Sequence, residues 1–187
     1  MRSLYDGSAD RKYLSYDERL AFYEVAKQLN DPRHRGFCLV LLHTGCRISE
    51  GLNLTRNQID HGGRSLIFLT LKQKGDVIHR PVPAPRKLLD VLGDFPDQDD
   101  GKLFAFGRTH GYNIVKKCMR AAGIEGVRAT PTGLRHGYAI GCVSMSFHQP
   151  QIQALLGHKR PETTTIYTTF TNDDIRDQLK EIWFMED

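Results

Sequence analysis

The chain has 187 residues, of which 40% are hydrophobic and 26% charged, and its formal net charge at pH 7 is +4. These values are typical of one globular domain with a real core and exclude a disordered or fibrous chain. The sequence has no apolar run near the roughly 20 residues of a membrane-spanning helix, and no apolar signal segment follows Met1. We therefore expect a cytoplasmic protein with no membrane partner.

Residues 1–13 are polar and patternless, and we expect a flexible tail or an interdomain linker there. Residues 14–187 then read as a single domain. Ser15 and Glu18 have the spacing of a capping box, which predicts a helix from there to about Leu29. The residues of this helix that we expect to face inward are Leu20, Tyr23, Val25 and Ala26.

Asp31 and Pro32 open a second helix, apolar enough to be central, and Gly45 ends it. A short helix follows in "CRISEGLNLT". The stretch "RSLIFLTLKQKGDVIHRPVPAP" changes to the β-branched and aromatic composition of strands, with "KQKGD" as the turn between two of them. The prolines expected to end the second strand are Pro81, Pro83 and Pro85.

The second half of the domain is predicted to be helical. Helices are expected in "RKLLDVLGDF", in the amphipathic stretch "HGYNIVKKCMRAAGI" with Gly123 as its C-cap, and from Pro131 to about Ser146. Three more are expected at Gln149–Leu156, Glu162–Thr169 and Asp173–Trp183. The fold class is therefore mainly α with a small antiparallel β-hairpin or three-stranded sheet (α+β).

The four cysteines lie in apolar contexts without C-x-x-C spacing. This pattern favours small buried side chains in a reducing compartment over disulfides or a zinc site. The cysteines are Cys38, Cys46, Cys118 and Cys142.

Positive charge is concentrated in one stretch of the chain. Residues 102–160 hold nine Lys or Arg and a single acid, Glu125, whereas the tail after Arg160 holds seven acids and two bases. A basic block on an otherwise near-neutral domain is typical of a protein that binds a polyanion, and a solvated charged surface explains it equally well.

Four stretches, taken in order, resemble the catalytic domain of the tyrosine recombinase (phage integrase) family. They are "HTGCRISEGLNL", "KQKGD", "TPTGLRHGYAI" and "LLGHKRPETTTIYTTF". The family pattern is an arginine in a TG-R-x-S-E helix start, a hairpin lysine, an H-x-L-R-H helix, an LGH turn and a nucleophilic tyrosine about nine residues later. Tyr167 lies nine residues after His158, and the match runs from about Leu14 to Phe170.

The resemblance implies a role for each matched residue. Two guanidinium groups can hold the non-bridging oxygens of a scissile phosphate bidentately, and a histidine can donate a further hydrogen bond. A tyrosine attacks phosphorus, and a lysine on the hairpin supplies a proton to the departing 5′ oxygen. The implied set is Arg47, Arg135, His158, Tyr167 and Lys74.

Several of these residues have alternatives. Lys72 competes with Lys74 because the hairpin register is open, although Lys74 directly precedes the turn glycine. Arg47 either pairs with Glu50 as an ordinary helix pair or is oriented by it for catalysis. Thr132 stands where the family has its first histidine, and a threonine cannot shuttle a proton near pH 7. The general-base role then passes to water, His158 or His136. Apart from this role, we expect His136 to be a structural residue.

The implied function is a site-specific DNA recombinase, of the integrase or invertase kind, that cleaves and rejoins strands through a 3′-phosphotyrosyl intermediate without metal, cofactor or ATP. The alternatives are a DNA-binding accessory factor with impaired catalysis and a type IB topoisomerase-like relaxing activity. The expected partners are double-stranded DNA with inverted-repeat core sites, in the nucleoid, and further copies of this chain in a tetramer. The residues expected to contact DNA are Lys72, Lys116, Lys117, Arg120, Lys159 and Arg160.

Residues 171–187 are predicted to form an acidic C-terminal helix with one apolar stripe. In the family, the segment after the nucleophile docks on a neighbouring subunit, and packing within the same chain is the equally weighted alternative. The stripe consists of Ile175, Leu179, Ile182 and Trp183.

Overall fold

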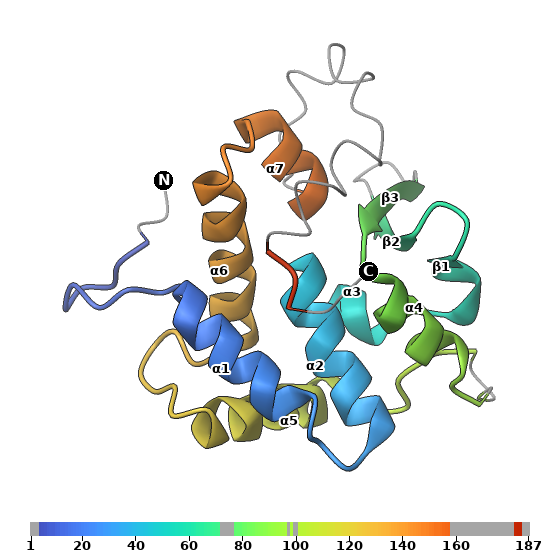
Figure 1. Ribbon diagram of the computed structural model, residues 1–187, viewed down its shortest axis with the longest axis horizontal. Helices are drawn as coiled ribbons and strands as arrows, with labels where there is room; N and C mark the ends of the chain where they lie inside the picture. Colours follow the sequence, from blue (N-terminus) through green and yellow to red (C-terminus); the bar gives the residue numbers. More distant parts are fainter. Residues whose placement is uncertain (1–3, 72–76, 97, 99–100, 158–181, 185–187) are drawn as a thin grey trace.

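The computed structural model describes residues 4–71, 77–96, 98, 101–157 and 182–184. Its helices surround a central helix, α2, and a small sheet lies to one side (Figure 1). The elements in chain order are α1 Tyr16–Ala26, α2 Pro32–Thr44, α3 Ile48–Leu52, the 3-10 turn Arg56–Gln58, β1 Ile59–Asp60, β2 Ser65–Leu71, β3 Val77–Pro83, α4 Arg86–Gly93, α5 Arg108–Ala121, α6 Pro131–Ser144 and α7 Gln149–Leu156. The predicted fold class is confirmed.

Local capping signals set the ends of these helices. The Ser15 hydroxyl accepts from the Glu18 amide, and the Glu18 carboxylate accepts from the Ser15 amide, which starts α1 as predicted. Asp31 caps α2 by accepting from two backbone amides. Gly45 ends α2 in the left-handed region at φ 58°. Such signals act within one turn of the chain, so they are visible in the sequence.

The buried face of α1 differs from the prediction. Leu20 is 37% exposed, whereas Arg19 and Phe22 are 2% and 0% exposed. The inward face follows Arg19, Phe22 and Ala26, a spacing of three and four residues that places them over α2, α5 and α6. The prediction is wrong for Leu20 and right for Ala26, while Tyr23 and Val25 are partly buried against the core. It missed Arg19 because it excluded a charged residue from the core. Arg19 is accommodated there by the Phe184 ring, 5.2 Å from its guanidinium carbon.

The sheet is antiparallel in the order β1-β2-β3. Pro81 lies inside β3, so the prediction that it ends the strand is wrong, whereas Pro83 is the last residue of β3, as predicted. β3 is an edge strand, and an edge strand tolerates prolines because one row of its amides needs no ladder partner. Pro85 does stop the extended segment, since α4 begins directly after it.

The core is continuous from α1 to the C-terminal segment. All four cysteines are buried and unbridged, as expected. Ile182 and Trp183 are 2% and 6% exposed, and the Ile182 carbonyl lies 3.4 Å from an Arg19 nitrogen of the same chain. These two residues were predicted to be helical but are not. The predicted helix Glu162–Thr169 and the rest of the helix Asp173–Trp183 lie outside the described residues.

Two further features complete the fold. Residues 4–13 contain a turn closed by a bridge between Tyr5 and Arg11, and Arg11 forms an ion pair of 2.9 Å with Glu18. Whether this segment is a linker stays a prediction. None of the helices in the described part of the chain combines the length and apolarity that crossing a bilayer requires.

Candidate functional site

The turn between α2 and α3 places Arg47. A Cβ on Gly45 would lie 2.5 Å from Cδ1 of the buried Tyr138, so only glycine fits at this close approach. The chain then reverses into α3, with Arg47 as the residue before its first turn. The Glu50 carboxylate accepts from the Arg47 amide at 2.7 Å and pairs with its guanidinium at 3.0 Å. Glu50 thus orients Arg47, and 42% of the Arg47 side chain remains exposed.

Arg135 reaches the same turn from α6. Its two terminal nitrogens donate to the carbonyls of Gly45 at 2.8 Å and Leu156 at 2.7 Å. Arg135 is 8% exposed, and burial, followed by the nearby Arg47, lowers its pKa to about 10. The guanidinium is therefore still charged at neutral pH. Two of its five N–H groups are used by these carbonyls, and the other three have no hydrogen-bond partner among the described residues.

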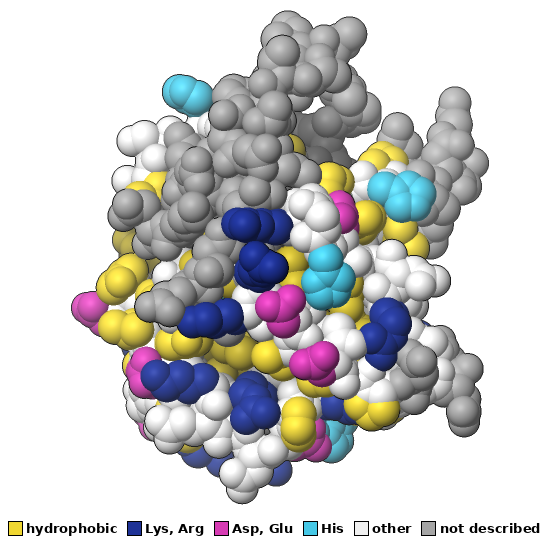
Figure 2. Space-filling view, turned by 45° about the vertical axis from the view of Figure 1, so that its right-hand side comes forward, with side chains coloured by type: hydrophobic (Ala, Val, Ile, Leu, Met, Phe, Trp, Pro, Cys, Tyr) yellow, Lys and Arg dark blue, Asp and Glu magenta, His cyan; other side chains and the backbone are white. Residues whose placement is uncertain are grey.

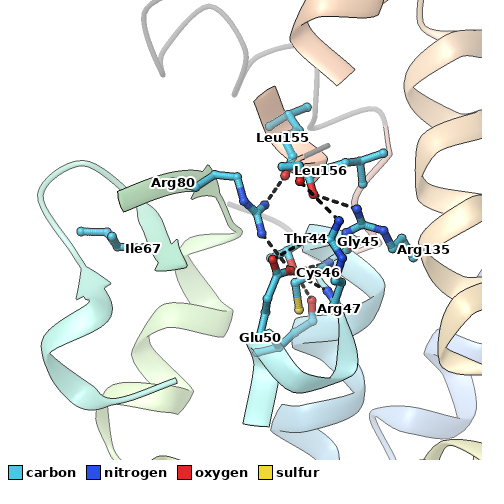
Figure 3. A network of polar contacts seen from close by, with 12 residues as sticks. Thr44, Gly45, Cys46, Arg47, Glu50, Ile67, Arg80, Arg135, Leu155 and Leu156 are labelled. Carbon is cyan, nitrogen blue, oxygen red and sulfur yellow. Dashed lines mark hydrogen bonds and ion pairs between the residues drawn. The ribbon is translucent and has the colours of Figure 1, made fainter. Parts of the chain in front are cut away.

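Three arginines converge on the last residues of α7 (Figure 3). Arg80, Arg135 and Arg47 donate to the three consecutive carbonyls of residues 155–157, with the Arg47 bond at 3.3 Å. These carbonyls form the negative end of a helix, which favours cations. We call Arg47, Arg80 and Arg135 the arginine cluster. The carbonyls that it contacts end at Gly157, the residue directly before His158.

Glu50 is the one acid that forms an ion pair with the arginine cluster in the described part of the chain. Burial alone would raise the pKa of Glu50, but Arg80 and then the Arg47 amide outweigh it and lower that pKa. Glu50 is therefore ionised at neutral pH. Three guanidinium groups against one carboxylate leave excess positive charge, which an anion would neutralise.

Arg80 is a cluster residue that the sequence analysis missed. It is 7% exposed, lies 2.9 Å from Glu50, and stacks on Phe68 with its carbon 4.9 Å from the ring centre. Phe68 is its cross-strand partner in the register of β2 and β3. Since strand side chains alternate, Arg80 shares the inward face with the buried Val82. A charged residue at an inward-facing position of the strand alternation was the sequence signal that could have identified Arg80.

The profile of the phage integrase family matches residues 12–173, most of this chain. The chain belongs to the phage integrase family. It is 28% identical over 179 residues to a "Tyrosine recombinase" of Thermosipho africanus (strain TCF52B), an alignment that covers 91% of this chain and 61% of that protein. The chain spans 53–61% of the length of the first curated relatives it matches.

Solved structures of the family share this fold. The crystal structure of XerA recombinase aligns with a TM-score of 0.65 and 28% identity, over 90% of this chain and 64% of that one. The XerH site-specific recombinase bound to difH substrate, in its pre-cleavage complex, aligns with a TM-score of 0.69 and 19% identity, over 92% and 58% of the two chains. At that identity the second match shows the fold alone.

Two other residues implied by the family resemblance lie on α6. Thr132 is exposed in its first turn, three residues before Arg135 and hence on the same side of the helix. His136 is half-buried, and burial, followed by Arg135, lowers its pKa. His136 is therefore neutral at pH 7. Its Nδ1 is shielded from solvent and makes no hydrogen bond with the described residues.

The basic residues of α5 lie apart from the arginine cluster. Lys116, Lys117 and Arg120 line a cavity of about 370 Å³, together with His34 from the first turn of α2. The cluster contacts the other end of α2, roughly 15 Å away at 1.5 Å per residue. Figure 1 shows α5 and α7 at opposite ends of the molecule. On the face drawn in Figure 2, basic and acidic side chains are interspersed.

Among the described residues, no group of three or more His, Cys, Asp or Glu side chains is placed to hold a metal ion.

The remaining predicted site residues lie outside the described residues. The predicted residues outside the described ranges are Lys72, Lys74, His158, Lys159, Arg160 and Tyr167.

Proposed function

We propose that this chain is the strand-exchanging part of a site-specific DNA recombinase that works through a 3′-phosphotyrosyl intermediate. The observation that carries the proposal is the convergence of Arg47 and Arg135, from separate helices, on carbonyls that directly precede His158. The excess positive charge there suits the single negative charge of a phosphodiester. Membership of the phage integrase family supports the same chemistry.

In this proposal the Tyr167 oxygen attacks the scissile phosphorus, and the bond to the 5′ oxygen breaks as the phosphotyrosyl bond forms. Lys74, or Lys72 in the alternative register, protonates the departing 5′ oxygen. Arg47 and Arg135 hold the non-bridging oxygens, with a hydrogen bond from His158. The phenol proton passes to water, His158 or the neutral His136. The 5′-hydroxyl of a second strand reverses these steps, so ligation needs no external energy source.

The proposed partners are double-stranded DNA with an inverted-repeat core site, within the nucleoid, and three further copies of this chain. XerH, which shares this fold, is bound to its difH substrate in the solved structure, and membership of the phage integrase family supports DNA as the partner of this chain. The DNA backbone, at a distance from the cleavage point, would be contacted by Lys116, Lys117 and Arg120. Ile182 and Trp183 are buried in the core of their own chain, so docking of the acidic segment 171–187 on a neighbouring subunit would release them from it and couple cleavage to assembly.

A nicked suicide duplex tests the proposal. The duplex is built from the inverted repeats in the DNA that flanks the gene, and the nick releases a short fragment so that cleavage cannot be reversed. Wild-type protein is expected to accumulate a covalent adduct that resists denaturing gel electrophoresis, and Tyr167→Phe is expected to form none. Equal adduct with Tyr167→Phe, or none with wild type, would overturn the proposal.

A second candidate function is a DNA-binding accessory factor with impaired catalysis. Thr132 favours it, because an exposed hydroxyl replaces the family histidine on the face of Arg135. Adduct formed by Thr132→His but not by the wild type would identify this case. Relaxation of supercoiled plasmid that needs no particular site would instead indicate a type IB topoisomerase-like activity.

A further inference from the structure

Arg80 has no part in the chemistry described so far, although it is central to the arginine cluster. Its Nε and Nη2 atoms are shielded from solvent, and it lies between the Phe68 ring and Glu50. A DNA phosphate therefore has no access to it. Arg47, by contrast, keeps 42% of its side chain exposed. Arg80 therefore acts on a phosphate at Arg47 without touching it, and the contacts of Arg80 show through which neighbour.

Glu50 is that neighbour, because it is shared between two arginines. Its Oε2 lies 2.9 Å from Arg80 and accepts from the Arg47 amide, and its Oε1 pairs with the Arg47 guanidinium. With Arg80 present, the carboxylate is neutralised from one side and orients Arg47 from the other. Without Arg80, the full negative charge of Glu50 faces Arg47 and competes with the phosphate for its guanidinium.

The backbone at Gly157 also packs closely on the Arg80 side chain. Gly157 has φ 64°, and a Cβ there would lie 2.8 Å from the Arg80 Nε. Arg80 donates to the carbonyl of Leu155 in the same turn. Arg80 therefore supports the segment whose next two carbonyls orient Arg135 and Arg47.

We propose that Arg80 is a positioning residue for the phosphate site, which neutralises Glu50 and thereby leaves Arg47 and Arg135 free to hold the phosphate. This inference rests on the proposed function. The net charge of the site distinguishes this role from a purely structural one. The cluster with Glu50 carries a charge of +2, and Arg80→Met reduces it to +1. The double variant Arg80→Met/Glu50→Gln restores +2 without restoring any contact of Arg80.

The test uses inorganic phosphate as the probe and the arginine Nε–H signals in ¹⁵N-NMR as the readout, at constant ionic strength with chloride as the reference anion. In wild type, phosphate is expected to shift the signals of Arg47 and Arg135 and to leave that of Arg80 in place. Arg80→Met is expected to weaken phosphate binding about tenfold, which corresponds to about 1.4 kcal/mol. Arg80→Lys, which keeps the charge beside Glu50, and the double variant are both expected to bind within about threefold of wild type.

Arg33→Met is the matched control. Arg33 also stacks on a phenylalanine, Phe95, and donates to backbone carbonyls, but it has no contact with Glu50. It is expected to leave phosphate affinity unchanged while the amide spectrum confirms folding of every variant.

Three results would overturn the inference alone: a phosphate-dependent shift of Arg80 as large as that of Arg47, unchanged affinity in Arg80→Met, or a full tenfold loss in the double variant. Absence of any shift at Arg47 and Arg135 in wild type would instead remove the phosphate site itself. It would overturn the proposed function and this inference together.

Discussion

Replacing Glu50 by glutamine should destabilise the protein far more than a surface charge change does. The carboxylate and its partner Arg80 have side chains only 9% and 7% exposed, with 2.9 Å between the charged atoms. Removing one partner leaves a buried charge uncompensated, which costs about 3–5 kcal/mol. The glutamine oxygen can still accept from the Arg47 amide, so we expect a loss of about 3 kcal/mol, at the lower end of this range.

Urea unfolding followed by circular dichroism measures this loss, and the melting temperature should fall by roughly 6–12 °C for a chain of this size. Glu24→Gln is the matched control. Glu24 pairs with Lys27 at 2.6 Å, but both side chains are 41–48% exposed, so the expected change is below about 0.5 kcal/mol. The double variant Arg80→Met/Glu50→Gln should recover much of the stability, because neutral groups then replace the buried pair.

The difference in unfolding free energy between wild type and Glu50→Gln should depend on pH in a defined direction. The pKa of Glu50 is lowered in the folded protein from its ordinary value of 4.5. Its stabilisation is therefore complete above about pH 5 and is lost as pH falls through the lower folded pKa. The gap between wild type and Glu50→Gln should shrink below pH 4.5. A gap under about 0.5 kcal/mol at pH 7, or one that widens in acid, would refute the assignment of a buried ion pair.

Two further predictions concern other parts of the molecule. His43 is fully buried, and burial followed by Arg19 lowers its pKa from 6.5 to about 3. Between these pH values the unfolded chain binds a proton that the folded chain does not, so wild type should lose up to about 5 kcal/mol of stability between pH 6.5 and 3. His43→Leu should remove that part of the slope in urea titrations, and an unchanged slope would contradict the burial argument. The double variant Lys116→Ala/Lys117→Ala should weaken binding to a random-sequence duplex. It should also reduce the steepness of log K plotted against log salt concentration by about one for each lost phosphate contact. Lys27→Ala is the control, since Lys27 is already paired with Glu24, and an unaltered salt slope in the double variant would exclude these lysines from the DNA contact.

The part of the site that sequence reasoning found depends on short-range signals. Gly45 is required where α2 ends, and Arg47 and Glu50 follow within five residues, so one motif encodes their mutual geometry. Pro131 likewise starts α6 and places Arg135 one turn later. A resemblance in residue order then linked these separate motifs. The structure adds that Arg47 and Arg135 donate to adjacent carbonyls.

Residues whose roles depend on distant elements were missed or misplaced. Arg80 is buried because Glu50 and Phe68 meet it from α3 and β2, and its phase with Val82 in β3 could have indicated the burial but not these partners. The basic side chains of α5 were predicted from charge to contact DNA, which stays a prediction, and the structure adds that α5 packs at the far end of α2, apart from the arginine cluster.

The sequence by itself determined where most of the described helices start and which residue types could serve the chemistry, because caps, turns and motifs act between neighbours along the chain. Only the tertiary structure decided that Arg19 faces inward while Leu20 does not, and that the guanidinium groups of Arg47 and Arg80 share the Glu50 carboxylate. Burial and electrostatic pairing depend on which surfaces meet. That choice is made by the packing of the whole chain, and no local stretch of sequence contains it.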